Sequence, residues 1–156
     1  MMPSLEYVAE IGSNHCGSLS IALELVQSAA RAGATAVKFQ LFRPHLLFKD
    51  PPPGLEKFAL RPEWLRELYD RAHSLGLKMG CTPFDIAAVP LLEGNVDFVK
   101  VSAYDLTWGD LLSALPSLGV PIVISTAMAS MEEISRAAAM LWPCDVTLLQ
   151  IGRAHV

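Results

Sequence analysis

Short apolar segments of strand length recur along the chain and alternate with longer segments in which apolar residues follow helical spacing. The strand-length segments are rich in Val, Ile and Ala and lack the alternating polar residues of a half-exposed strand. Strands of this composition are typical of a parallel sheet that is covered by helices. The predicted strands are residues 7–11, 36–40, 78–81, 98–102, 121–125 and 146–149.

Four segments between these strands have the pattern of helices, with apolar residues three and four positions apart. Gly33 and Gly76 each follow such a segment, at the position where a glycine often ends a helix. Ser130 and Glu133 form the spacing of a capping box at the start of another segment. Pro116 weakens the helical pattern around it, because proline lacks a backbone N–H. The predicted helices are residues 19–32, 62–75, 106–118 and 131–141.

The alternation of strand and helix predicts an α/β fold with parallel strands joined by right-handed crossovers. With 156 residues, 52% hydrophobic and 18% charged, the chain is long and apolar enough for one globular domain. The long segment 41–61 interrupts the alternation with Pro44 and a run of three prolines that ends at Gly54. Such a segment is either an ordered binding loop or a linker, and the sequence favours neither.

Charge and cysteine content argue against several classes of protein. The formal net charge of −4 argues against a general nucleic-acid-binding protein, which normally carries a basic face. No stretch approaches the roughly 20 consecutive apolar residues of a membrane span, and the first residues lack a secretory signature. Cys16, Cys81 and Cys144 show no paired spacing, so we expect reduced thiols, a cytoplasmic location and a packed, structural Cys81.

Polar residues gather where the predicted strands end. The carboxyl ends of parallel strands lie at one edge of the sheet, which is where α/β proteins bind their ligands. Lysines with hydroxyl and amide groups at this edge suit a phosphate-bearing anion, and carboxylates suit proton transfer or sugar hydroxyls. The residues that meet this description are Glu10, Ser13, Asn14, His15, Lys38, Gln40, Thr82, Lys100, Asp105, Ser125 and Thr126.

The sequence marks some of these residues more strongly than others. Lys38 and Glu10 lie within apolar strands, where an unpaired charge is costly, and this favours a function for both. His15 is interpreted as a hydrogen-bonding residue of the turn rather than as a ligand. We expect Lys78 and Asp85 to be surface groups, as most charged residues are.

Five motifs resemble those of the sialic acid synthase family, in the same order and spacing. This family makes N-acetylneuraminate and relatives such as pseudaminate and legionaminate. The resemblance spans Tyr7 to Leu149 and implies the (β/α)8 barrel of the family. Such a barrel takes about 250 residues, so we expect a truncated (β/α)8 TIM barrel in residues 1–149, with about five βα units plus a sixth strand. The motifs are A-E-I-G-S-N-H-C-G, A-V-K-F-Q, C-T-P-F, V-K-V-S-A-Y-D-L and S-T-A-M-A-S-M-E-E-I.

The resemblance also implies a reaction between phosphoenolpyruvate and an N-acylated aldose such as N-acetylmannosamine. Carbon 3 of phosphoenolpyruvate attacks the aldehyde, which a divalent metal (Mn or Mg) polarises. Water adds at the former enol carbon, and phosphate leaves by C–O cleavage. By resemblance, Glu10 and Asp105 are catalytic, and Asn14 and His15 build the turn at the site. The residues implied in phosphoenolpyruvate binding are Lys38, Gln40, Thr82, Lys100 and Ser125.

The chain departs from the usual pattern of this family at four positions. Asp105 stands where the family usually has Glu, which is one methylene longer. Ala103 stands at a common Ser, so one phosphate-binding hydroxyl is expected to be missing. Ala127 replaces a usual Gly, and Cys81 replaces a usual Ser. These departures leave the sugar specificity open.

The last residues differ from the family more strongly. The family usually continues Leu-Leu-His-Cys after the sixth strand, whereas this chain has Gln150 followed by I-G-R-A-H-V. These six residues are identical to the translation of a common sequencing-library adapter in one reading frame. We therefore expect residues 150–156 to be a non-native tail. The family's metal-binding histidines lie beyond this point. We therefore expect no metal ligands in this chain, an inactive fragment, and no basis for transferring the family's homodimer.

Three alternatives remain for the function. One alternative is another phosphoenolpyruvate-condensing barrel that makes a 3-deoxy sugar acid, although the A-E-x-G-x-N-H-x-G and T-P-F motifs argue against this. The chain is otherwise a non-catalytic half-barrel that binds phosphoenolpyruvate or a sugar, or an association domain that binds neither. Small molecules, and not nucleic acid or membrane, are the expected ligands of the first two alternatives, whereas the third predicts no ligand binding.

Overall fold

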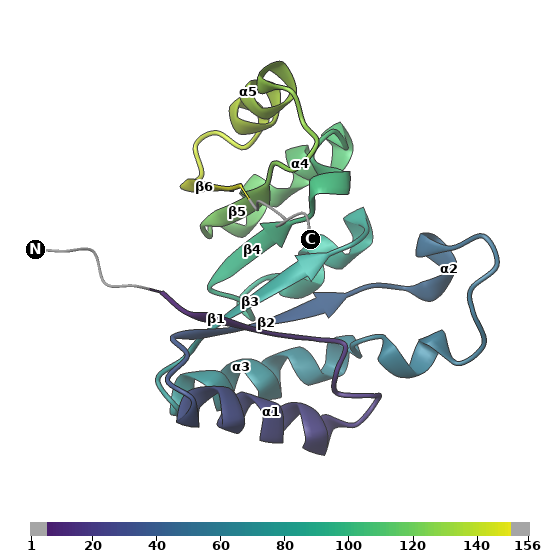
Figure 1. Ribbon diagram of the computed structural model, residues 1–156, viewed down its shortest axis with the longest axis vertical. Helices are drawn as coiled ribbons and strands as arrows, with labels where there is room; N and C mark the ends of the chain where they lie inside the picture. Colours follow the sequence, from purple (N-terminus) through teal and green to yellow (C-terminus); the bar gives the residue numbers. More distant parts are fainter. Residues whose placement is uncertain (1–5, 151–156) are drawn as a thin grey trace, which may run out of the picture.

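The strands of the protein form a single parallel sheet in the computed structural model, which describes residues 6–150 (Figure 1). The sheet has six strands, and each strand pairs with the next one in the chain. In the described part of the chain, β1 and β6 are therefore the two edge strands. The strands are β1 (Val8–Gly12), β2 (Ala36–Leu41), β3 (Lys78–Pro83), β4 (Phe98–Val101), β5 (Ile122–Ser125) and β6 (Val146–Leu149).

Helices pack against this sheet in two groups. One group, α1 and α3, lies side by side against β1, β2 and β3, and the other, α4 and α5, lies beyond β4 (Figure 1). The α-helices are α1 (Leu19–Arg31), α2 (Pro44–Leu47), α3 (Leu65–Ser74), α4 (Gly109–Ala114) and α5 (Met131–Met140). The 3-10 helices are η1 (Leu55–Phe58), η2 (Pro62–Trp64), η3 (Ile86–Leu92), η4 (Ala103–Asp105) and η5 (Leu115–Leu118).

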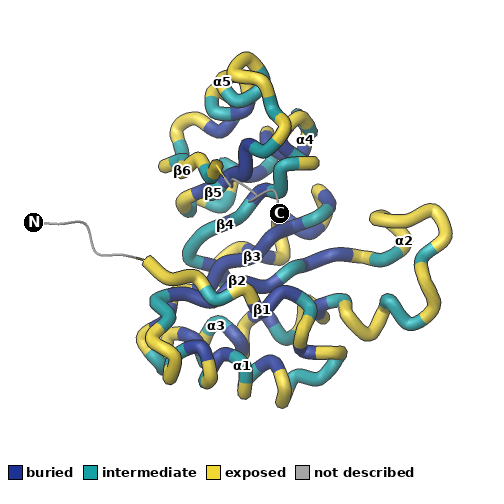
Figure 2. Tube along the Cα trace, in the orientation of Figure 1, coloured by how far each residue is buried: buried dark blue, intermediate teal, exposed yellow. Residues whose placement is uncertain are grey.

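The core lies between the helices and one face of the sheet. Successive residues of a strand point to opposite faces, so in β2 the residues Val37 and Phe39 share one face and Lys38 and Gln40 the other. Val37 and Phe39 are fully buried, as are the matching residues of β3, β4 and β5. Figure 2 shows this burial following the strands, whereas the segment around α2 is exposed. The opposite face of the sheet, which carries Lys38 and Gln40, is therefore the face on which polar side chains gather.

The predicted strands all form, with ends within two residues of the expected ones. The predicted helices form too, but two of them are divided. The segment 62–75 begins with the 3-10 turn η2 and continues as α3, and the segment around Pro116 splits into α4 and η5. The capping box of Ser130 and Glu133 is confirmed at the start of α5. Gly33 and Gly76 both have positive φ after their helices, as expected.

Two features of the fold were not predicted. The crossover between β3 and β4 is the 3-10 helix η3, in which Pro90 excludes an α-helical pattern. The long segment 41–61 contains α2 and η1, and it packs back onto the domain. Leu60 is buried in the core, and a Cβ at Gly17 would lie 2.8 Å from the carbonyl oxygen of Lys57. The segment is thus an ordered loop that lies against the β1–α1 turn.

The observed architecture is an α/β fold with six parallel strands in one sheet, as predicted. Truncation of a barrel stays a prediction. The predicted non-native tail lies outside the described residues except for Gln150, whose side-chain oxygen accepts a hydrogen bond from Thr126. None of the helices within residues 6–150 is long and apolar enough to cross a membrane.

Candidate active site

The centre of the site is an ion pair between adjacent strands. Glu10 of β1 is the register partner of Lys38 of β2, and the Lys38 Nζ lies 2.5 Å from Glu10 Oε2. The same ammonium donates to Thr82 Oγ1 of β3 at 3.2 Å. Gln40 donates to the other carboxylate oxygen of Glu10 over a long 3.5 Å. Strands β1, β2 and β3 thus bring four of the predicted site residues together.

Burial differs between the two charges of this pair. Lys38 is 8% exposed and Thr82 is 2% exposed, so the ammonium has exchanged water for Glu10 and the threonine hydroxyl. A buried ammonium without such partners would be strongly disfavoured. The side chain of Glu10 is 47% exposed, because β1 is an edge strand of the described sheet. The expectation that both charges lie buried within apolar strands is therefore confirmed for Lys38 and is wrong for Glu10.

Lys100 is the second ammonium of the site and lies two strands from Lys38, on β4. It is half-buried, and no carboxylate of residues 6–150 lies within ion-pair distance of its Nζ. Burial lowers the pKa of Lys100 and the nearby charge of Lys38 lowers it further, while Glu10 and Asp105 oppose this shift. A bound anion would relieve both penalties. Lys100 is thus the cation of the site that is best suited to meet a ligand.

Asp105 and Ser125 lie at the same end of the sheet as the two lysines. Asp105 ends η4, the turn that follows β4, and its Oδ2 accepts a hydrogen bond of 2.5 Å from Ser102. Ser125 ends β5 and is 5% exposed. Within residues 6–150 no hydrogen bond joins Ser125 to either lysine. The neighbouring Thr126 hydroxyl instead donates to the Leu149 carbonyl of β6 at 3.0 Å.

Asn14 and His15 lie in the turn between β1 and α1. Asn14 Nδ2 donates to the Ile11 carbonyl at 2.9 Å, and His15 Nδ1 accepts from the backbone of Gly17 at 3.1 Å. The His15 ring is fully buried and meets the edge of Trp64 at a centroid distance of 5.8 Å. Its Nε2 has no hydrogen-bond partner among the described residues. Burial accordingly lowers the pKa of His15.

A cavity of about 450 Å³ lies directly beyond the carboxyl ends of β2, β3 and β4. At one side of it, the Arg43 Nε donates to Asp85 Oδ2 at 3.0 Å and its terminal nitrogen pairs with Oδ1. The same carboxylate caps η3 by accepting from the Ala88 N–H at 2.8 Å. Asp85 is only 5% exposed, so its prediction as a surface group is wrong, whereas Lys78 is exposed as predicted. The lining residues are Arg43, Leu46, Leu47, Phe84, Asp85, Ile86, Ala87, Asp105 and Trp108.

Sequence reasoning missed Arg43, Asp85 and Trp108 as residues of this region. Asp85 precedes Ala88 by the three-residue spacing of a helix cap, and that spacing was the available signal. Its partner Arg43 is 42 residues away in the sequence, so no local sequence pattern predicts that the two residues pair. Cys81 is buried as predicted, and burial raises its pKa to about 12, which leaves the thiol protonated and inert at neutral pH.

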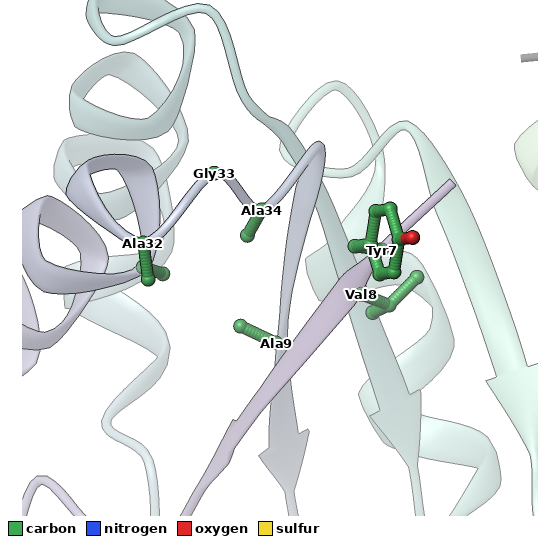
Figure 3. Close-up of a pocket in the computed structure, with 7 residues that line it drawn as sticks. Tyr7, Val8, Ala9, Ala32, Gly33 and Ala34 are labelled. Atoms are coloured by element: carbon green, nitrogen blue, oxygen red, sulfur yellow. The ribbon is translucent and has the colours of Figure 1, made fainter. Parts of the chain in front are cut away.

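A second cavity differs from this site in its chemistry. An apolar cavity of about 290 Å³ lies beside the amino-terminal half of β1 and is lined mainly by alanines (Figure 3). It carries no charged group, so it offers no catalytic chemistry. The described residues, 6–150, also contain no group of three or more His, Cys, Asp or Glu that could hold a metal ion. The predicted divalent metal stays a prediction.

Fold and site together define an α/β protein whose cations and hydroxyls meet at the carboxyl ends of parallel strands, where enzymes of this class bind anions. The chain belongs to the NeuB family, whose model matches residues 25–153. The recognition of the sialic acid synthase family from sequence motifs is thereby confirmed.

Three relatives illustrate this membership. The N,N'-diacetyllegionaminic acid synthase of Legionella pneumophila is 30% identical over 154 residues, which cover 87% of this chain and 43% of that protein. The N-acetylneuraminate-9-phosphate synthase of Homo sapiens is 30% identical over 157 residues, covering 88% and 43%. The crystal structure of N-acetylneuraminic acid synthetase from Leptospira borgpetersenii, in complex with citrate, is 27% identical with a TM-score of 0.85, covering 92% and 53%. The chain thus spans about two fifths of the length of the first two relatives and about half of the Leptospira borgpetersenii chain.

Proposed function

We propose that the whole protein condenses phosphoenolpyruvate with an N-acylated aldose to form a nonulosonic acid. The observation that carries this proposal is the presence of two ammoniums on β2 and β4: Lys38, which donates to the Thr82 hydroxyl of the strand between them, and Lys100, whose pKa is lowered by burial and by the charge of Lys38. We further propose that residues 1–149 are the amino-terminal portion of a (β/α)8 barrel. The family membership and the six consecutive parallel strands support this view.

In the proposed site, the phosphate and carboxylate of phosphoenolpyruvate lie against Lys38, Lys100 and Thr82. Gln40 and Ser125 supply further polar contacts. Phosphoenolpyruvate is multiply charged, and fixed ammoniums in a partly buried site stabilise such an anion better than they would in water. Because Glu10 already balances Lys38 at 2.5 Å, Lys100 contributes the larger part of the uncompensated positive charge.

The proposed reaction forms one carbon–carbon bond, forms one carbon–oxygen bond to water, and breaks the carbon–oxygen bond to phosphate. Carbon 3 of phosphoenolpyruvate attacks the aldehyde carbon, whose oxygen takes up a proton and becomes a hydroxyl. The positive charge that develops at carbon 2 lies near Glu10 and Asp105, which stabilise it electrostatically. Water adds at carbon 2 and loses one proton, which balances the proton taken up by the aldehyde oxygen. The resulting hydroxyl then loses its second proton and becomes the ketone as phosphate leaves, with the oxygen that joined it to carbon 2, as hydrogen phosphate. The divalent metal expected from the resemblance would polarise the aldehyde in the whole protein, whereas residues 6–150 contain no cluster of ligands that could hold it.

A binding experiment on the 156-residue chain tests this proposal. We expect isothermal titration calorimetry to detect phosphoenolpyruvate binding, and Lys100→Met to weaken it at least tenfold, about the effect of losing one charge-assisted contact. The matched control is Lys78→Met, because Lys78 is exposed, pairs with Glu6 and lies at the opposite end of the strands. Equal affinity of the Lys100→Met variant and the parent chain would remove Lys100 from the site.

The same preparation separates catalysis from binding. Phosphate release in the presence of both phosphoenolpyruvate and N-acetylmannosamine would show that residues 1–156 are sufficient for the reaction. Binding without phosphate release would support a binding fragment whose remaining catalytic groups lie in the rest of the family's length. Failure to bind phosphoenolpyruvate at all would contradict the proposed site.

A further inference from the structure

The activities of the relatives differ in the charge at the far end of their sugar. The rim cavity, which is the cavity formed by the nine lining residues given above, bears on this difference. One relative is a synthase of a legionaminic acid and another is a synthase of N-acetylneuraminate 9-phosphate. A nine-carbon acid built from phosphoenolpyruvate takes three carbons from it, so carbon 9 of the product is carbon 6 of the aldose. The two activities therefore require sugars whose far ends are uncharged and phosphorylated, respectively.

The rim cavity lies where the far end of the sugar would extend. Arg43 follows β2, the strand of Lys38, and Phe84 and Asp85 follow β3, the strand of Thr82. Asp105 connects the rim cavity with the two lysines, because it lines the cavity and its charge acts on Lys100. An aldose whose reacting carbon lies beside Lys38 and Lys100 therefore has this cavity as its continuation. Its volume of about 450 Å³ is within the range of small-molecule sites.

The charges of the rim cavity do not suit a phosphate. Arg43 is the one cation among the lining residues, and both of its contacting nitrogens are engaged by Asp85. The guanidinium is thus already compensated by a carboxylate, and the hydrogen bond to Asp85 raises the pKa of Arg43. Asp105 adds a second negative charge to the lining. The described lining thus holds one cation against two carboxylates, and a phosphate dianion there would meet net repulsion.

The remaining lining suits an apolar substituent. Leu46, Leu47 and Ile86 are between 38% and 52% exposed, which leaves apolar surface uncovered at the mouth of the cavity. Trp108 and Phe84 contribute aromatic surface to the same lining. Methyl groups of an acylamino or deoxy sugar would remove this surface from water, whereas a phosphate would lose its hydration there without gaining a free cation.

We infer that the rim cavity holds the far end of the aldose and selects sugars whose far end is uncharged over their 6-phosphates. This inference rests on the proposed function, because it assumes that the reacting carbon of the sugar lies beside Lys38 and Lys100. Arg43, Asp85 and Leu47 are then residues that determine specificity. They do so through charge balance and apolar lining rather than through contact with the reacting atoms.

The test is a pair of titrations on the 156-residue chain saturated with phosphoenolpyruvate. One uses N-acetylmannosamine and the other uses N-acetylmannosamine 6-phosphate. We expect the neutral sugar to bind at least tenfold more tightly. Phosphoenolpyruvate binding with equal or tighter binding of the phosphosugar would overturn the inference and leave the proposed function standing, as would binding of neither sugar. Loss of phosphoenolpyruvate binding itself would overturn the proposed function, and this inference with it.

Two variants test the cause of the selectivity. Asp85→Asn keeps an oxygen that can cap η3 but removes the charge that neutralises Arg43, so the affinity ratio should shift toward the phosphosugar at least fivefold. Leu47→Lys adds a cation at an exposed position that tolerates charge, and it should shift the ratio in the same direction even if Asp85→Asn folds poorly. The control is Asp70→Asn, which alters an exposed ion pair on α3. An unchanged ratio in Leu47→Lys would overturn the assignment of the cavity.

Discussion

The two lysines of the site differ in a way that their sequence contexts do not reveal. Lys38 is buried and already paired with Glu10, whereas Lys100 is half-buried beside that same positive charge without an ion pair of its own among residues 6–150. Lys38 therefore has its partners within the protein, whereas Lys100 lies in an environment that disfavours its charge and that a bound anion would improve. Charged groups in unfavourable surroundings are common at functional sites, because the rest of the fold supplies the stability that offsets their cost.

His15 gives the protein a stability that depends on pH. Its pKa is lowered by burial, so between that lowered value and the ordinary value of about 6.5 the unfolded chain binds more protons than the folded one. Stability therefore falls as the pH drops through this window, and it is regained above the unfolded pKa. We expect His15→Gln to lose less stability than the parent between pH 7.5 and pH 5, as measured by urea unfolding. Parallel pH dependences of the two proteins would contradict this role.

Gly80 is required by packing rather than by backbone conformation. A Cβ at this position of β3 would lie 2.2 Å from the ring of Phe98 on β4, so Gly80→Ala forces the aromatic ring or the strands to move. We expect a loss of about 1–3 kcal/mol in the free energy of unfolding, as for other overpacked sites. Gly109→Ala is the control, because its Cβ would meet only the flexible end of Met140 at 3.3 Å. Equal stabilities of the two variants would contradict the packing argument.

At the scale of single elements, the start of α5 is fixed by reciprocal hydrogen bonds. The Glu133 carboxylate accepts from the backbone of Ser130 at 2.8 Å, and the Ser130 hydroxyl accepts from the Glu133 N–H at 3.3 Å. The first of these contacts also lowers the pKa of Glu133. The capping box thus satisfies backbone donors that the first turn of the helix leaves without partners.

Removing this cap should destabilise the protein by about 1 kcal/mol, the usual cost of losing an N-cap side chain. The variant is Ser130→Ala, and chemical denaturation followed by circular dichroism measures the change. Ser135→Ala is the matched control, because the Ser135 hydroxyl only donates to the Met131 carbonyl within the same helix. If Ser135→Ala were as destabilising as Ser130→Ala, the capping box would not be what stabilises the start of α5.

Elements could be predicted from the sequence where one physical signal dominated. The strands could be predicted because burial against the helices makes their sequences apolar. Helix α5 could be predicted because its capping residues are close together in the sequence. Helix η3 was missed because Pro90 and its 3-10 geometry leave no α-helical periodicity. The division at Pro116 was only partly foreseen, since proline predicts a weak point but not which turn changes its hydrogen bonding.

At the scale of the whole molecule, the convergence of the site residues could be predicted but their pairings could not. Parallel strands place all carboxyl ends at one edge, and that rule alone brought Glu10, Lys38 and Thr82 to one place. Which groups touch depends on register, and Glu10 faces Lys38 just before an irregularity in the pairing of β1 with β2. The Arg43–Asp85 pair depends on a loop conformation that no local pattern specifies.

The chain-order arrangement of the strands has a consequence for the protein during its synthesis. Every strand from β2 onward pairs with one that has already left the ribosome, so the sheet can grow in the direction of translation without waiting for a distant partner. Glu10, Lys38 and Thr82 all lie within the first three strands. The contacts that hold the buried ammonium are therefore complete once β3 has emerged, and β4 then adds Lys100 beside an ammonium that is already paired.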